Sequence, residues 1–397
     1  MIRFLILLLV FQLFTIGVFA QDISNSNPPN VVLILIDDSG LMDFGSFGGE
    51  AQTPNIDSLA KRGLMFTNMH ASPVCAPSRA MLMTGSDSHL AGVANLPEML
   101  PLEYQDLKGY GGVLDDSVQT IASRLKELDY NTYVTGKWHL GHDEKTLPTK
   151  RGFDRSFILG ASGADNYVAS GYLPMKSTAQ WYADGEPTDL PNNFYSSEYY
   201  VDQMIRFHEE ENDSDQPFFS YIAFQAIHAP IQAPKEFVEK YKSVYTAGWD
   251  VLREKRFATA KQMGIIPADA EMNPMFEEMN AWESVSEENK KEYITDMAVM
   301  AGMLEAMDYH IGRYLKYLKE NGLDENTVFI ITSDNGPDGG DYEKMHGWAK
   351  RHGYHRDFDN YGGKRYYGSI RPEFASAIAA PFSYFKYYTG EGGLRVP

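Results

Sequence analysis

Runs of consecutive apolar residues recur along the chain and are separated by amphipathic stretches. Residues 31–36 (Val-Val-Leu-Ile-Leu-Ile) form a continuous β-branched run, which is typical of a strand buried on both faces of a sheet. Residues 132–135, 218–224 and 327–332 are further candidates for buried strands. Strands that alternate with helices indicate the α/β class, with a mostly parallel central sheet sandwiched by helices.

Capping residues and amphipathic segments between these runs predict the helices. Thr53 and Pro54 supply an N-cap and a first-turn proline for a helix that ends near Arg62. Residues 166–200 are rich in Tyr, Pro and Gly and are expected to form a surface loop. Residues 235–291 carry many charges and methionines, and we expect a helical insertion over one end of the sheet. The pattern also predicts helices over 77–83, 117–128 and 294–318, and a strand within 64–70.

The N-terminus has the features of a secretory signal peptide. Arg3 precedes an uncharged apolar run to Ala20, and the small residue before Gln21 suits cleavage. The alternative is an uncleaved membrane anchor, for which the run is slightly short. We therefore expect signal peptide 1–20 and a periplasmic or secreted protein, off the membrane after cleavage. The net charge of −19 argues against nucleic acid or an anionic membrane as partner.

Cys75 is the only cysteine among the 397 residues, so it cannot form an intramolecular disulfide. Pro77 suits the first turn of a helix, and Arg79 lies four residues after Cys75 on the same helical face. Free backbone N–H groups and a guanidinium beside a sulfur atom predict an anion pocket. The alternative is a buried cysteine that acts as a small apolar residue.

Two pairs of residues with side-chain oxygen atoms directly follow predicted strands. Asp37 and Asp38 come after 31–36, and Asp334 and Asn335 come after 327–332. Sites in open α/β sheets form beyond the carboxyl ends of the strands. Three carboxylates and one amide oxygen suit Ca²⁺ or Mg²⁺. Taken alone, each pair is more typical of a turn than of a metal site.

Three basic residues follow two other predicted strands. Lys137 and His139 follow 132–135, and a period of two would point both side chains to one side of the strand. That side would present a fixed cation and a group that titrates near neutrality. His228 comes just before a proline after 218–224. Each of these residues alone is also compatible with a surface or structural role.

The segment Cys75-Ala76-Pro77-Ser78-Arg79, followed by Thr84-Gly85, resembles the sulfatase signature at six positions, and the block Gly136-Lys137-Trp138-His139 resembles a second family motif. The resemblance extends from about Asn30 to Pro397. It implies an alkaline-phosphatase-like fold in which 21–397 is the catalytic domain. In that family a smaller C-terminal sheet subdomain follows a segment like 392–397, so the sequence looks truncated at its C-terminal end.

The resemblance also implies roles for the candidate residues. Cys75 would be converted to formylglycine by a formylglycine-generating maturation enzyme, and the aldehyde hydrate would be the nucleophile. One Ca²⁺ ion would bind Asp37, Asp38, Asp334 and Asn335. Lys386, with Lys364 as the competing assignment, would contact the substrate. Arg79, Lys137 and Lys386 would neutralise sulfate oxygens, His228 would assist the leaving group and His139 would accept a proton from the nucleophile.

The implied activity is hydrolysis of sulfate monoesters, most like that of bacterial arylsulfatases. Alternatives are a carbohydrate sulfatase, a phosphonate or phosphate monoester hydrolase of the same superfamily, and an inactive secreted anion-binding fragment. An all-oxygen metal set argues against a two-zinc phosphatase. Aromatic residues of the irregular region would stack on a substrate ring or simply pack the loop; they are Trp181, Tyr182, Tyr195, Tyr199 and Tyr200.

Overall fold

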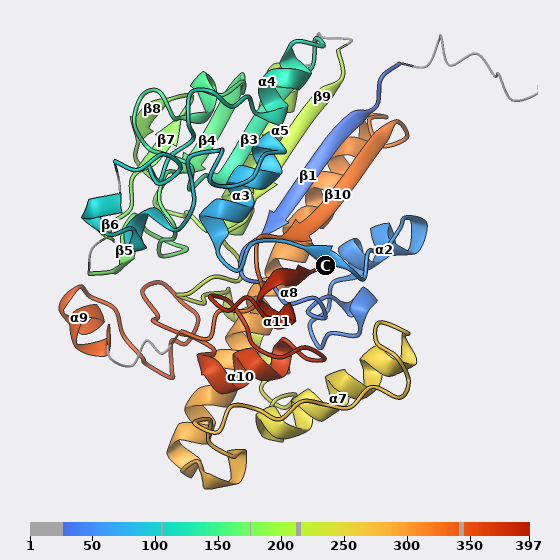
Figure 1. Ribbon diagram of the computed structural model, residues 1–397, viewed down its shortest axis with the longest axis vertical. Coiled ribbons are helices and arrows are strands. Elements are labelled where there is room, and N and C mark those ends of the chain that lie inside the picture. The colour runs from blue at the N-terminus through green and yellow to red at the C-terminus, as the bar shows by residue number, and fades with distance from the viewer. Residues whose placement is uncertain (1–26, 105, 175, 212–215, 341–344) are drawn as a thin grey trace, which may run out of the picture.

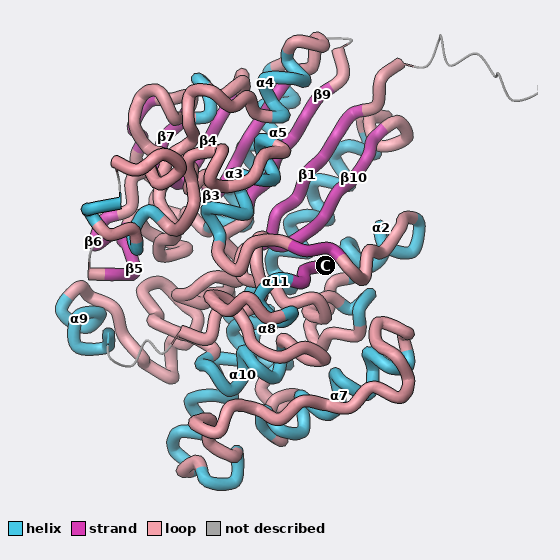
Figure 2. Tube along the Cα trace, in the orientation of Figure 1, coloured by secondary structure: helices cyan, strands magenta, loops and turns pink. Residues whose placement is uncertain are grey.

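The computed structural model describes residues 27–104, 106–174, 176–211, 216–340 and 345–397. Its centre is a twisted sheet (Figures 1 and 2). In spatial order the sheet consists of β10 (Thr327–Ser333), β1 (Asn30–Ile36), β9 (Phe218–Ala223), β3 (Asn131–Lys137), β4 (Arg155–Leu159), β7 (Trp181–Ala183) and β8 (Glu186–Thr188). The first five strands are parallel, and β7 and β8 add antiparallel pairs at one edge.

Apolar side chains cover both faces of the sheet. In β1, Leu33 and Leu35 join one core with α3 (Cys75–Thr84) and α4 (Ile121–Lys126). The alternate residues of β1 join a second core with α5 (Ser196–Glu210) and α8 (Glu287–Glu320). Figure 1 shows α3 in front of the sheet and α8 behind it. The predicted parallel sheet between two helical layers is therefore confirmed.

The other elements surround this sandwich. The helices α7 (Gly248–Gln262) and α10 (Arg371–Ile378) lie beyond the carboxyl ends of β1 and β10 (Figure 1). The remaining helices are α2 (Pro54–Arg62), α6 (Lys235–Val238), α9 (His346–Arg351) and α11 (Glu391–Leu394). Short 3₁₀ helices are η2 (Gly45–Phe47), η3 (Pro97–Met99), η4 (Leu102–Tyr104), η5 (Pro148–Lys150), η6 (Glu239–Tyr241) and η7 (Trp282–Ser284). Two small antiparallel pairs join β2 (Met69–His70) to β11 (Arg395–Val396) and β5 (Ser170–Leu173) to β6 (Lys176–Thr178).

Three local predictions need adjustment. The helix expected to begin at Pro77 begins at Cys75. The amphipathic helix is shorter than expected, because the Thr120 side chain caps it by accepting from the backbone of Ser123. The strand expected within 64–70 is reduced to two residues, and Leu64 is 85% exposed. Apolar character alone therefore misplaced this strand, since only its last two residues find a partner strand.

The prediction of a surface loop at 166–200 is wrong. The segment contains β5 to β8 and the start of α5, and its aromatic rings are packed inside. Trp181 stacks on Phe157 at 5.6 Å and meets Phe194 at 5.1 Å between ring centroids. Tyr200 is fully buried in the same cluster. The rings of Trp181, Phe194 and Tyr200 extend the core.

Two further expectations concern the helical insertion at 235–291 and the signal peptide at 1–20. Residues 235–291 contain α6, η6, α7, η7 and the first turn of α8. The predicted signal peptide, 1–20, lies outside the described residues. Within the described part of the chain, every helix is too short or too polar to cross a membrane.

Candidate active site

The candidate residues converge at the carboxyl ends of the parallel strands, where the sheet of an α/β fold presents its loops. Asp37 and Asp38 follow β1, and the backbone of Asp38 is left-handed with φ 66°. This turn brings both carboxylates toward one point, although neighbouring side chains of a regular strand point to opposite faces. Both residues are fully buried or nearly so.

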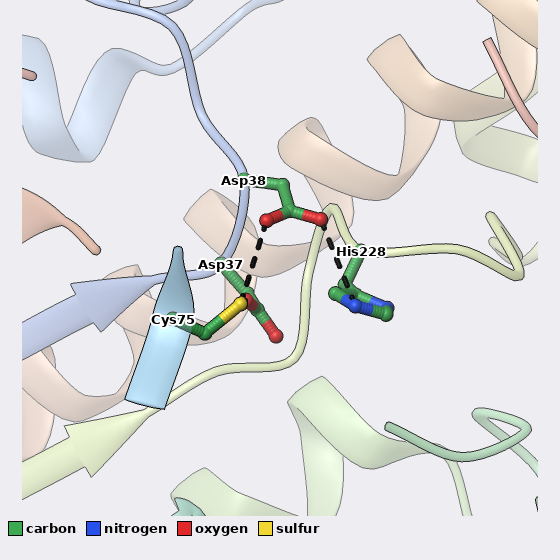
Figure 3. A group of neighbouring side chains, drawn as sticks. All are labelled: Asp37, Asp38, Cys75 and His228. Carbon is green, nitrogen blue, oxygen red and sulfur yellow. Dashed lines mark hydrogen bonds and ion pairs between the residues drawn. The ribbon is translucent and has the colours of Figure 1, made fainter. Parts of the chain in front are cut away.

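Cys75 lies directly against these carboxylates. Its Sγ is 3.5 Å from Asp37 Oδ1 and 3.8 Å from Asp38 Oδ1. Figure 3 shows Cys75 and His228 on either side of Asp38, with Asp37 beside the sulfur. Ligand atoms of these four side chains all lie within 4.8 Å of one another. Burial and the negative charge of Asp334 raise the pKa of the Cys75 thiol well above its usual value.

Arg79 joins helix α3 to the end of β10. Its Nε and Nη2 lie 2.9 and 2.8 Å from Asp334 Oδ2, and Nη2 is 3.5 Å from Asp37 Oδ1. The predicted placement of Arg79 one helical turn after Cys75 is therefore observed. The guanidinium faces two carboxylates, and all three side chains are fully inaccessible to solvent.

Lys137 reaches the same cluster from the last residue of β3. Its Nζ donates to Asp37 Oδ2 at 2.6 Å, and its carbonyl accepts from Arg79 Nη1 at 2.7 Å. The preceding Gly136 has φ +105°, and a Cβ there would lie 1.9 Å from the carbonyl oxygen of Ala223 on β9. Only glycine allows this close approach of the two strands, so Gly136 sets the direction of Lys137.

His228 follows β9 and faces Asp38 from the opposite side. Its Nε2 is 3.7 Å from Asp38 Oδ2 and 3.4 Å from the hydroxyl of Tyr172. Its Nδ1 lies 2.5 Å from the carbonyl oxygen of Ala229, which can only accept, so Nδ1 carries a hydrogen. Tyr172 belongs to β5 and was missed in the sequence, because nothing in its local pattern separates it from neighbouring tyrosines.

Lys386 enters the cluster from the C-terminal part of the chain. Its Nζ lies 2.8 Å from Asp38 Oδ1 and 2.9 Å from Asp38 Oδ2. Its backbone N–H donates to the carbonyl of Pro337 in the loop after β10. The competing candidate, Lys364, is an exposed residue whose backbone carbonyl accepts a hydrogen bond from His355. The geometry thus favours Lys386 over Lys364.

His139 stands slightly apart from the carboxylate cluster. Strand β3 ends at Lys137, and His139 has a left-handed backbone with φ 58°, so the period-two argument does not extend to it. Its Nε2 is 3.1 Å from Glu98 Oε2. No described hydrogen bond joins its ring to Cys75. Glu98, in η3, is a second residue that the sequence did not reveal, because it lies in an irregular segment without a motif.

The four predicted metal ligands share one hydrogen-bonded cluster. The backbone N–H of Asp38 donates to Asp334 Oδ1 at 3.2 Å, and Asn335 Nδ2 donates to Asp38 Oδ1 at 2.6 Å. Asn335 Oδ1 is buried and has no hydrogen-bond partner among the described residues. Oxygen donors held this way fit a hard divalent cation such as Ca²⁺. Asp37, Asp38, Asp334 and Asn335 would hold it.

Burial and neighbouring charges shift the pKa values in opposite directions. Burial, reinforced by Asp334, raises the pKa of Asp37 to about 8. Burial also acts to raise the pKa of Asp38, but Lys386 and the other nearby cations overcome it and hold that pKa well below its usual range. Burial lowers the pKa of His228 well below its usual value. Such opposed shifts in one cluster are typical of functional sites.

Known proteins resemble this chain along most of its length. The family model described as Sulfatase matches residues 29–376. An arylsulfatase of Klebsiella aerogenes is 34% identical over 92% of this chain and 79% of its own length. An uncharacterized sulfatase of Schizosaccharomyces pombe is 35% identical over 94% and 70%.

Solved structures extend the comparison to the fold. Ps i-CgsB in complex with k-i-k-neocarrahexaose superposes with a TM-score of 0.61 at 26% identity, covering 94% of this chain and 65% of that chain. The present chain therefore spans slightly less than two thirds of that structure. Phosphonate monoester hydrolase of Agrobacterium radiobacter has the same fold, with a TM-score of 0.51 at 18% identity over 93% of this chain and 67% of that chain. With the sulfatase model matched from before β1 into α10, this chain belongs to the sulfatase family.

Proposed function

We propose that this protein hydrolyses sulfate monoesters, with aryl sulfates as its substrate class. The observation that carries the proposal is the position of Cys75, whose Sγ lies 3.5 and 3.8 Å from two buried carboxylates of a cation-rich cluster. Arg79, Lys137 and Lys386 surround that cluster. A sulfate monoester needs such charges, because its own negative oxygens repel an incoming nucleophile. Positive groups fixed before the reaction are usually the largest catalytic contribution.

The family relationship supports two groups that complete the site. Conversion of Cys75 to formylglycine by a maturation enzyme would supply a nucleophilic oxygen, and one Ca²⁺ at Asp37, Asp38, Asp334 and Asn335 would supply further positive charge. The residues around Cys75 suit this chemistry. Arg79 and Lys137 are anchored by carboxylates, so their charges are fixed in direction and need no reorganisation when substrate binds.

His228 and His139 would each carry out one proton transfer of the reaction. Burial favours the neutral ring of His228, and the charge of Asp38 opposes this effect. Nε2 faces Asp38, and once the ring has taken up a proton this atom would deliver it to the departing phenol oxygen. Lys386 lies on the same carboxylate and would assist by stabilising negative charge on that oxygen. His139 would accept a proton from the nucleophile in the later half of the reaction.

The choice of aryl substrates rests on the arylsulfatase of Klebsiella aerogenes, at 34% identity over 92% of this chain. A carbohydrate sulfatase is the second candidate. It is favoured by Ps i-CgsB, solved with k-i-k-neocarrahexaose, and by N-acetylgalactosamine-6-sulfatase of Rattus norvegicus, which is 33% identical over 53% of this chain and 42% of its own length. The likeness to the phosphonate hydrolase is below 25% identity and supports the fold alone. We also propose a periplasmic or secreted location, from the apolar N-terminus.

The mass of one peptide tests the proposal directly. Trypsin releases residues 63–79 of the protein from its natural host as a single peptide. We expect this peptide to be lighter than the unmodified sequence by the change from a CH₂SH to a CHO side chain. An unmodified thiol in all of the protein would support the inactive anion-binding alternative and contradict the enzymatic one.

A substrate panel then separates the enzymatic candidates. Values of kcat/KM for an aryl sulfate, sulfated monosaccharides and an aryl phosphonate monoester would be measured on the same preparation. We expect the aryl sulfate to be turned over fastest. Higher kcat/KM for a sulfated sugar would select the carbohydrate sulfatase, and higher kcat/KM for the phosphonate would reject both sulfatase candidates.

A further inference from the structure

His139 and Glu98 form a buried pair beside the carboxylate cluster. The two side chains are 2% and 7% exposed, and Nε2 of the ring lies 3.1 Å from Glu98 Oε2. Glu98 belongs to the short helix η3, 41 residues before His139 in the chain. The contact is therefore created by the folding of the loop that follows α3 over the end of β3.

The hydrogen bond decides which ring nitrogen carries the proton. A carboxylate can only accept, so Nε2 must donate to Glu98. In the neutral ring Nδ1 is then the nitrogen with a free lone pair. Nδ1 is buried and has no hydrogen-bond partner among the described residues. It is thus a buried acceptor that a substrate group or a reacting hydroxyl would satisfy.

Burial keeps the His139 ring neutral before reaction. Burial lowers the pKa of His139 to about 4, and the positive charges of Lys137 and Arg79 act in the same direction. Glu98 opposes them through its charge and its hydrogen bond. Glu98 is therefore the negative partner that compensates the positive charge when the ring takes up a proton.

A cavity of about 240 Å³ adjoins the pair. Glu98 and His139 both line it, together with Gly111, Gly112 and residues that follow β3 and β4. Most of the cluster around Asp37 is closed to solvent, but this cavity lets water approach His139. The pair therefore borders a space that water can fill.

We propose that Glu98 is a positioning residue for His139, one that fixes the ring as the Nε2–H tautomer and leaves Nδ1 to accept a proton during turnover. The role rests on the proposed function. In that step a hydroxyl of the hydrated aldehyde at residue 75 would give its proton to Nδ1; its electron pair would form the aldehyde C=O bond, and the C–O bond to sulfate would break. Nε2–H would stay hydrogen-bonded to Glu98 throughout. The imidazolium is balanced by the Glu98 carboxylate, and its proton then passes to water in the cavity. The arrangement follows the same logic as the acid that orients the histidine of a serine hydrolase triad.

The tautomer is measured first, because this readout does not require activity. Long-range ¹H–¹⁵N spectra of the whole protein distinguish protonated from unprotonated ring nitrogens, and the His139 signals are assigned by their loss in His139→Gln. We expect Nε2–H with an unprotonated Nδ1 in the wild type. In Glu98→Gln the amide can donate or accept, so we expect a mixture of tautomers. A wild-type ring protonated at Nδ1 alone would overturn the proposal.

Kinetics on an aryl sulfate supply the second readout. We expect Glu98→Gln to lower kcat at least about tenfold with KM changed less than about threefold, because Glu98 acts through His139 and not on bound substrate. Glu103→Gln, which removes an exposed carboxylate in the neighbouring η4, is the matched control and should keep wild-type kcat. Equal kcat in the two variants would overturn the role of Glu98. If the wild type hydrolyses no sulfate ester, the proposed function fails, while the tautomer still decides whether Glu98 orients His139.

Discussion

Lys386 places its Nζ almost equally far from the two carboxylate oxygens of Asp38, at 2.8 and 2.9 Å, although 348 residues separate them. Both side chains are nearly inaccessible to solvent. The pair connects the first strand of the sheet with the C-terminal part of the chain, across the centre of the candidate site. A buried charge pair of this kind has strong consequences when one partner is removed.

Replacing Lys386 by methionine should reduce both activity and stability. The variant keeps the length of the side chain but leaves the Asp38 carboxylate buried without its main cation. We expect kcat/KM for an aryl sulfate to fall at least about 100-fold and the free energy of unfolding to fall by about 3 kcal/mol. Steady-state kinetics and urea unfolding measure the two effects. Lys364→Met, at the exposed competitor, is the control, and wild-type kinetics in Lys386→Met would rule out the assignment.

Cys75→Ser should abolish multiple turnover while the protein remains folded. Serine is close to cysteine in size, so the packing around Asp37 is kept. A single hydroxyl lacks the second oxygen that a hydrated aldehyde provides, so release of sulfate should stall. Turnover of an aryl sulfate and the near-ultraviolet circular dichroism spectrum are measured together. Undiminished multiple-turnover rates in this variant would contradict the proposed nucleophile.

Calcium should stabilise the folded protein, independently of activity. A cation that binds only the native state adds about 2.7 kcal/mol at a free concentration 100 times its Kd. We therefore expect the melting temperature to fall with EDTA and to recover with Ca²⁺. Asn335→Ala should weaken this response, because it removes a buried oxygen that has no described hydrogen-bond partner. Glu325→Gln, an exposed change in the turn before β10, should respond like the wild type. A melting temperature insensitive to both EDTA and Ca²⁺ would refute the metal site.

His208 should make the protein less stable in acid. It belongs to α5, and its Nε2 is 3.1 Å from Ser220 Oγ on β9 and 2.8 Å from the hydroxyl of Tyr314 on α8. Burial lowers its pKa to about 3, below the usual value of 6.5. The folded state therefore favours the neutral ring, and its stabilising contribution is complete above pH 6.5. As the pH falls from 6.5 toward 3, the unfolded chain binds a proton that the folded protein does not.

The expected loss from this group is about 1.4 kcal/mol of unfolding free energy per pH unit within that window. Denaturant unfolding of the wild type and His208→Asn at several pH values measures it. His208→Asn should be less stable at pH 7 but should show a smaller decline in acid. His89→Asn, at an exposed histidine, should retain the wild-type pH dependence. Identical slopes for wild type and His208→Asn would refute the prediction.

Local sequence patterns determined the strands and several residues at their ends. The apolar run 31–36 predicts β1 because a strand covered on both faces needs apolar side chains at every position. Its parallel pairing with β9 and β10 then brings Asp37, His228 and Asp334 to one edge of the sheet. The motif around Cys75 likewise placed Arg79 on the same helical face, since four residues complete about one turn.

Only the tertiary structure decided how the remaining groups meet. Glu98 and Tyr172 lie in segments without a periodic pattern, so their contacts with His139 and His228 depend on how long connections cross the sheet end. The irregular segment 166–200 became strands and core, because its aromatic rings bury more apolar surface against Phe157 and Phe194 than a surface loop would. The sequence by itself thus determined the four strands β1, β3, β9 and β10 and the polar residues that end or follow them. Long-range packing decided which side chains touch. Such contacts depend on the paths of the long connections between strands, and a local sequence pattern does not specify those paths.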